Sequence, residues 1–229
     1  MRTDHGGGVP GSTTFAQTLS ALKREGSSIL LVGRTSATAH RAACRRLMGD
    51  SEEPRQRLYV FTTGTETCGQ GPSSEQRGET RVLSQENEAG VAASPKGLPD
   101  DITEAVVGPQ LLSTLGTAII DDLDDMESEH ELDPGELRLC FDSVTPLLRE
   151  HKSQNVFRLL HMVTSRTRQA DGMGHFHLPL DRDSDYVRLL EPLFDAVVEV
   201  RRTEEDDEVR LEQRWHLRDR DAESGWIEI

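Results

Sequence analysis

The sequence is poor in lysine and in aromatic residues. Only Lys23, Lys96 and Lys152 are lysines among its 26 basic residues, and Phe, Trp and Tyr together make up 4% of the chain. Acidic residues number 41, so the formal net charge at pH 7 is −15. A field of that sign repels phosphate backbones and excludes general nucleic-acid binding. Acid excess with few lysines indicates a high-salt cytoplasm, where repulsion is screened within about 3 Å. A bias toward arginine codons would explain only the lysine deficit.

Long apolar runs are also missing, and none reaches the roughly 20 residues of a membrane helix. Residues 1–14 are polar and glycine-rich, without the apolar core of a signal peptide. We therefore expect a disordered tail over 1–14, a cytoplasmic location and no membrane contact.

Cysteine is scarce, with Cys44, Cys68 and Cys140 widely spaced and no C-x-x-C pair. An odd count at such spacing argues against a disulfide framework and against a thiolate zinc site. Cys44 and Cys140 lie within apolar patterns, so we expect buried, inert thiols.

Short apolar strands alternate with helical patterns along the chain, which predicts an α/β fold. Its sheet is mainly parallel and is covered by helices on both faces. The C-terminal part predicts an antiparallel hairpin. We expect a single domain over 15–229 with a mobile insertion around 64–100. The predicted strands are 27–33, 57–63, 80–84, 136–142, 173–180, 196–202 and 208–217; the predicted helices are 15–22, 39–47, 112–126, 143 onward, 153–172 and 184–190.

A small-residue loop between a strand and a helix is the setting of a phosphate-binding loop, G-x-x-x-x-G-K-[ST]. Aligned at Gly33, the sequence reads G-R-T-S-A-T-A-H. Thr38, Ala39 and His40 replace the second glycine, the phosphate-binding lysine and the magnesium-binding hydroxyl. The helix N-terminus still favours anions, and Arg34 adds positive charge. The loop therefore predicts a remnant of a nucleotide site without its chemistry.

The strand 136–142 ends at Asp142, an acid that can hold a magnesium-bound water. The alternative is that Asp142 caps the helix that follows it.

Four runs carry a resemblance to a known family: F-D-S-V-T-P-L-L (141–148), V-F-R-L-L-H-M-V-T-S-R-T-R (156–168), D-G-M-G-H-F-H-L (171–178) and L-F-D-A-V-V-E-V-R (193–201). With the loop at Gly33, they resemble the RecA/KaiC-like proteins of halophilic archaea, which often have degenerate nucleotide sites. The resemblance covers roughly 15–229. It implies a RecA-like sheet with Asp142 at the Walker B position. The remnant nucleotide site would consist of Gly33, Arg34, Thr35, Ser36, Thr38 and Asp142.

The family's catalytic glutamate follows its second strand. Here that place reads Thr62-Thr63-Gly64, and Glu66 comes too far along. We expect no ATPase activity and no catalytic residue at this site.

His175 and His177 share one face of the strand 173–180, between Asp171 and Asp181. An H-x-H pair at a strand end can begin a hydrolytic metal site, for which His161 and Asp142 are topologically available ligands. The alternative is two histidines packed between sheet and helix and hydrogen-bonded to backbone, and this is our prediction, with no metal ligand.

The leading hypothesis is a non-catalytic RecA/KaiC-like protein that binds another, unknown protein in regulation or signalling. One alternative is a nucleotide-binding switch without hydrolysis, which binds ATP and magnesium weakly. A second is a metal-dependent hydrolase that uses His175 and His177. We expect no cofactor under the leading hypothesis, and a homo-oligomer is compatible with it.

Overall fold

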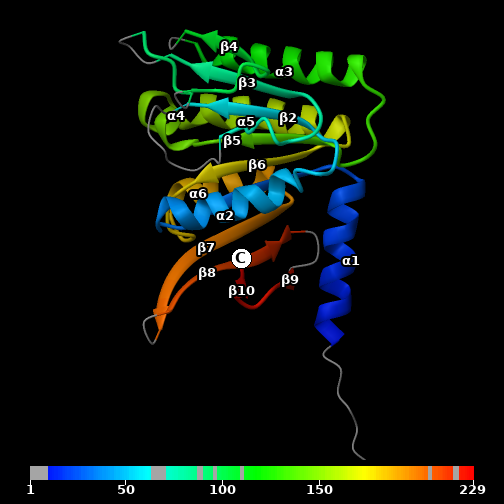
Figure 1. Ribbon diagram of the computed structural model, residues 1–229. Helices are drawn as coiled ribbons and strands as arrows, with labels where there is room; N and C mark the ends of the chain where they lie inside the picture. The colour runs from blue at the N-terminus through cyan, green and yellow to red at the C-terminus, as the bar shows by residue number, and fades with distance from the viewer. Residues whose placement is uncertain are drawn as a thin grey trace, which may run out of the picture.

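One twisted sheet runs through the computed structural model (Figure 1). The structure describes residues 10–62, 71–86, 90–94, 97–108, 111–205, 208–218 and 222–229. In this part of the chain the sheet has ten strands in the order β10-β8-β7-β1-β6-β5-β2-β3-β4, with β9 also paired to β8. The seven strands from β7 to β4 are mutually parallel, whereas β8, β9 and β10 add antiparallel pairs at one end.

The strands are β1 (Ser27–Val32), β2 (Gln56–Phe61), β3 (Thr80–Gln85), β4 (Thr103–Val107), β5 (Leu137–Phe141), β6 (Met173–Leu178), β7 (Ala196–Glu205), β8 (Glu208–Leu217), β9 (Ala222–Glu223) and β10 (Ile227–Glu228). The helices are α1 (Pro10–Arg24), α2 (Ala37–Met48), α3 (Leu112–Glu129), α4 (Thr145–Glu150), α5 (Ser153–Gln169) and α6 (Asp185–Leu190), followed by the 3-10 turn η1 (Glu191–Leu193).

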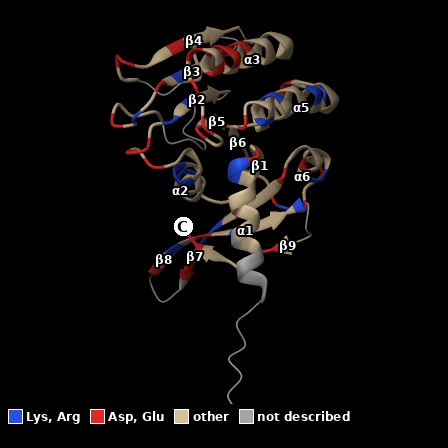
Figure 2. Ribbon diagram, turned by 90° about the vertical axis from the view of Figure 1, so that its right-hand side faces the viewer, with Lys and Arg blue, Asp and Glu red and all other residues tan. Residues whose placement is uncertain are grey.

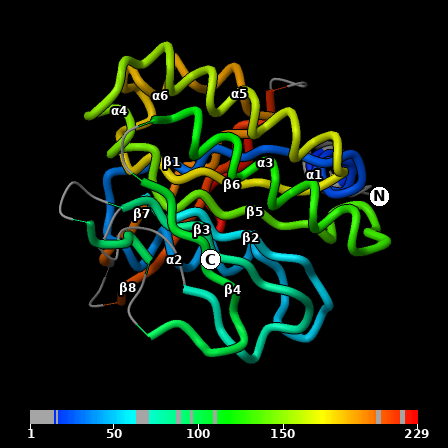
Figure 3. Tube along the Cα trace, turned by 90° about the horizontal axis from the view of Figure 1, so that it is seen from above, coloured from blue at the N-terminus to red at the C-terminus, as the bar shows by residue number. Residues whose placement is uncertain are grey.

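Helices cover both faces of the parallel strands. One face packs against α3, α4, α5 and α6 in the largest apolar cluster, and Figure 3 shows α4, α5 and α6 together on that side. The other face packs against α2 and α1 in two smaller clusters. Strands β1, β2, β5 and β6 are buried on both faces, as is expected for the interior of a parallel sheet. The predicted α/β class with a mostly parallel, doubly covered sheet is therefore confirmed.

The C-terminal hairpin is also confirmed, because β7 and β8 pair antiparallel over their whole length. Val198 lies opposite Trp215, which is buried against the apolar cluster that α1 and α2 cover. The last strand, β10, pairs with β8, and the ring of Trp226 before it lies beneath the guanidinium groups of Arg201 and Arg214. The C-terminal segment therefore closes onto this end of the sheet.

Two features differ from the sequence expectations. Helix α1 begins at Pro10, inside the predicted tail, and residues 1–9 lie outside the described residues. The strand predicted at 80–84 is confirmed as β3, which lies between β2 and β4; residues 63–70, 87–89 and 95–96, in and beside the predicted insertion, lie outside the described residues. Strand β4 was not predicted, because T-E-A-V-V is short and exposed.

None of the helices in the described part of the chain combines the length and the apolar character that a membrane crossing requires.

Candidate functional site

The loop after β1 and the acid after β5 meet at one edge of the sheet. Parallel strands end at the same edge, where α/β proteins usually bind their ligands. Gly33 follows β1, Thr62 follows β2 and Asp142 follows β5. The structure therefore brings the two halves of the predicted remnant site to the same edge, separated by β6.

The backbone conformation and the close packing of β7 require glycine at position 33. Its φ of +128° is a conformation that side-chain-bearing residues rarely adopt, and a Cβ there would lie 2.2 Å from the carbonyl oxygen of Val200. The backbone of β7 thus approaches the loop too closely for any other residue. The one glycine that matches the phosphate-loop pattern is explained by packing.

The side chain of His40 points into the protein interior, beneath the loop. It is buried, and its Nε2 lies 2.9 Å from the carbonyl oxygen of Gly33. Burial, together with the neighbouring His177, lowers the pKa of His40 to about 4. The ring is therefore neutral at pH 7 and donates its Nε2 proton to Gly33. A hydroxyl at this position would hold magnesium, whereas this imidazole is hydrogen-bonded to Gly33, the first residue of the loop.

The remaining loop residues face solvent or are small. Arg34 is exposed and lies 3.8 Å from the carboxylate of Asp181, which is also exposed. Ser36 precedes α2 but its hydroxyl does not cap the helix. Thr38 is exposed and Ala39 is fully buried, so this stretch has no positive charge beyond Arg34.

Asp142 is buried and already hydrogen-bonded. Its Oδ1 accepts from the backbone N–H of Thr62 at 2.8 Å and from the Thr62 hydroxyl at 3.0 Å. The carboxylate thus ties the end of β5 to the end of β2. Thr63, Gly64 and Glu66 lie outside the described residues.

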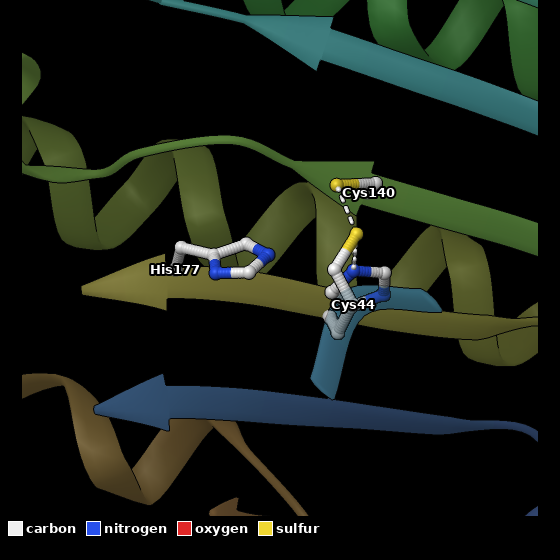
Figure 4. Close-up of side chains that lie close together, drawn as sticks. Cys44, Cys140 and His177 are labelled. Carbon is white, nitrogen blue, oxygen red and sulfur yellow. Dashed lines mark hydrogen bonds between the residues drawn. The ribbon is translucent and has the colours of Figure 1, made fainter. Parts of the chain in front are cut away.

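A second group of side chains lies behind the loop, between α2 and the sheet. Cys44 of α2, Cys140 of β5, and His175 and His177 of β6 each place one potential ligand atom within 4.8 Å of all the others. The two sulfurs are 3.6 Å apart, and Nε2 of His175 lies 3.2 Å from the sulfur of Cys44. In Figure 4 the ring of His177 points along β6 toward the two cysteines. All four side chains are at most 2% exposed.

This arrangement corrects the prediction for the two histidines. They are buried between sheet and helix, as predicted, but their side chains bond other side chains and not backbone: His175 bonds Cys44, and His177 bonds His40. The predicted extra ligands are not brought in. His161 is exposed on α5, and Asp142 is bonded to Thr62.

The electrostatics of the group favour a neutral His177 ring and an acidic Cys44 thiol. A hydrogen bond with Cys140, with His175 nearby, holds the pKa of Cys44 well below its usual range although burial opposes it. Burial lowers the pKa of His177. A deprotonated thiol and neutral rings are the forms in which these residues bind metals.

Cys44 and Cys140 are buried, as expected, but their spacing along the chain carries no signal that they lie beside the histidines. The signal lies in strand pairing. Cys140 is in register with His175 on the neighbouring parallel strand, so the two side chains share a face. A strand order derived from the sequence would have placed β5 beside β6 and shown this pair.

Comparison with known proteins gives a family but no activity. Residues 26–200 match a family of unknown function (DUF7504). No curated protein matches the chain.

Proposed function

Because the chain belongs to the family DUF7504, whose function is unknown, we propose a function from the geometry of its own site. The protein is a non-catalytic, RecA/KaiC-like protein that acts by binding another protein in regulation or signalling. The remnant nucleotide site serves this role as a rigid scaffold. It does not transfer phosphate.

The hydrogen bond between His40 and Gly33 carries this proposal. In a working phosphate loop the side chain at this place faces the ligand, together with the lysine before it. Here the ring lies under the loop and bonds its carbonyl at 2.9 Å, and the lysine is replaced by the buried Ala39. The one cation in the described loop is Arg34, which is exposed and lies 3.8 Å from the carboxylate of Asp181. The loop therefore lacks the lysine that neutralises charge on a transferred phosphate, which is the main catalytic requirement of phosphoryl transfer.

The state of Asp142 gives further support. Its Oδ1 accepts two hydrogen bonds from Thr62, and the side chain is 2% exposed. A carboxylate that holds a magnesium-bound water must face the nucleotide. The position of Asp142 one strand away from β1, across β6, is compatible with descent from a RecA/KaiC-like nucleotide site.

Strand β4 supplies a surface for a protein partner. It is the edge of the sheet and pairs only with β3 among the described strands. Four of its five residues are exposed, and Val106 retains 47% of its surface. An exposed strand edge presents unpaired backbone groups that can pair with an extended segment of another chain. The nearby α3 is rich in acidic residues, and β4 adds Glu104 (Figure 2). We therefore propose that the partner contributes an extended, positively charged segment.

Nucleotide assays test the non-catalytic part. We expect no ATP hydrolysis above a mock purification, in molar KCl with magnesium, and no change on Asp142→Asn. Hydrolysis that is present in the wild type and lost in Asp142→Asn would refute the proposal.

The partner surface is tested by a matched pair of variants. Val106→Lys adds a positive charge to the β4 edge, and Val209→Lys makes the same change at the far hairpin, where Val209 is 54% exposed. We expect a partner identified by cross-linking to bind the wild type and Val209→Lys but not Val106→Lys, with slower amide exchange in β4 on binding. Equal binding by both variants would exclude β4 as the surface.

A further inference from the structure

We propose that Cys44, Cys140, His175 and His177 bind one zinc ion in a closed, buried, structural site. None of the four ligands is a residue on which the proposed function depends; the two proposals share only His40, which bonds both Gly33 and His177. Zinc content is measured separately from nucleotide binding and from partner binding at β4, so either proposal can fail alone.

The spacing of the four donors fits a tetrahedral ion. Zinc lies about 2.3 Å from thiolate sulfur and about 2.0–2.1 Å from imidazole nitrogen, so its four ligands are roughly 3.3–3.8 Å from one another. The observed sulfur–sulfur distance is 3.6 Å, and the distance from Nε2 of His175 to the Cys44 sulfur is 3.2 Å. Two sulfur and two nitrogen donors in this geometry indicate zinc among the common metals.

The charge balance fits the burial. Both cysteines bind as thiolates, so a Zn²⁺ ion with two thiolates and two neutral imidazoles carries no net charge. A neutral centre avoids the large cost of an uncompensated charge in the interior. Without a metal, the same interior contains two thiols and two imidazoles that are at most 2% exposed.

His177 provides an independent observation that points to a ligand. Its Nε2 is fully buried and has no hydrogen-bond partner. Its Nδ1 lies 3.2 Å from Nδ1 of His40, whose Nε2 bonds Gly33. Because His40 donates from Nε2, its Nδ1 accepts, and His177 must donate from Nδ1. The lone pair of His177 is then on Nε2, which is the state of a metal-binding histidine with an outer hydrogen bond that fixes its orientation.

The closed surroundings indicate a structural ion. Catalytic zinc sites keep one position open for water or substrate, whereas structural sites have four protein ligands. Here four ligands are present and all are buried, which argues against the hydrolase alternative. The ion would join α2 to β5 and β6, and so hold the helix that follows the loop against the centre of the sheet.

A second group, Glu79, Glu129 and His130, also has ligand spacing, but it is accounted for without a metal. Arg81 pairs with both carboxylates, at 2.6 Å and 2.7 Å, and His130 lies 2.9 Å from Glu79. His130 therefore supplies a control for the zinc site.

The test is elemental analysis of protein purified under reducing conditions, without chelator and with a tag free of histidine. We expect one zinc per chain in the wild type, and loss of that zinc in Cys44→Ser and His175→Ala. The matched controls Cys68→Ser and His130→Ala keep it. His40→Ala lowers the zinc affinity about 10–100-fold, because it removes the outer hydrogen bond of His177.

A measurement on the wild type alone covers the case in which the variants do not fold. X-ray absorption at the zinc edge should give two sulfur and two nitrogen neighbours. The proposal is overturned by a shell of oxygen and nitrogen only, by wild-type protein that contains no metal and takes up no stoichiometric zinc, or by a Cys44–Cys140 disulfide in freshly reduced protein.

Discussion

His40 and His177 face each other through their Nδ1 atoms, 3.2 Å apart, in the interior between α2 and β6. The pair connects the loop at Gly33 to the cysteine–histidine group behind it. One proton lies between the two nitrogens, and the bond from His40 to Gly33 determines which ring donates it. The loop that resembles a phosphate site is thus tied to the core from within.

Replacing His40 should destabilise the protein. His40→Ala leaves the buried Nδ1–H of His177 and the carbonyl of Gly33 each without this partner, which costs about 1–3 kcal/mol of unfolding free energy. Urea denaturation in molar KCl measures the loss. Thr38→Ala, on the exposed side of the same helical turn, should stay within about 0.5 kcal/mol of the wild type. Equal stability of the two variants would contradict the role given to His40.

Gly33→Ala should be much more damaging than Gly90→Ala, although both glycines have positive φ. A Cβ at Gly33 would lie 2.2 Å from the Val200 oxygen, whereas a Cβ at Gly90 has nothing within 4 Å. Gly90→Ala should cost about 1–2 kcal/mol for the backbone conformation alone. Gly33→Ala also has to displace β7, and we expect soluble yield or the melting temperature to fall sharply. Similar melting temperatures would show that β7 can move away easily.

The two tryptophans should differ in their contribution to stability. Trp215 is 8% exposed within the apolar cluster under α1 and α2, so Trp215→Ala should cost about 3–5 kcal/mol. Trp226 is half-buried beneath Arg201 and Arg214, with the Arg201 carbon 3.8 Å from the ring centre. Trp226→Ala should therefore cost only about 1 kcal/mol. Chemical denaturation of both variants checks the order, and a larger loss from Trp226→Ala would contradict it.

The melting temperature should rise strongly from low to molar KCl. The net charge is −15, so the acidic side chains repel one another at low ionic strength, and salt screens that repulsion. Thermal melts in a KCl series measure the effect. A variant with Glu52→Gln, Asp100→Asn and Asp101→Asn, all at exposed positions, should show a shallower rise. A melting temperature that does not change with salt would count against the high-salt interpretation.

Most of the fold could be predicted because its strands are short, apolar and separated by clear helical stripes. Ser27–Val32 and Leu137–Phe141 are buried on both faces and stand out as apolar runs. Thr103–Val107 could not be recognised, since an edge strand with four exposed residues has no apolar pattern. The sequence predicts a tail over Pro10–Thr14, because glycine and polar residues precede the apolar stripe of α1.

The candidate site was only partly predictable. The family resemblance predicts that Gly33 and Asp142 belong to one remnant site, and both do follow parallel strands. His175 and His177 were placed on one buried face by their alternation in β6. Cys44 and Cys140 could not be added, since their proximity depends on where α2 crosses the sheet and on the pairing of β5 with β6.

The positions of the four side chains also affect how the protein folds. Cys44 and Cys140 are 96 residues apart, and Cys44 and His175 are 131 apart. Contacts between such distant residues form slowly, because the chain between them must first be ordered. The group cannot assemble until β5 and β6 have paired beneath α2, so it forms at a late stage. During synthesis the Cys44 thiol remains accessible to solvent until β5 and β6, in the second half of the chain, have emerged. Labelling of the cysteines with a thiol reagent at intervals during refolding would therefore show when this part of the core becomes buried.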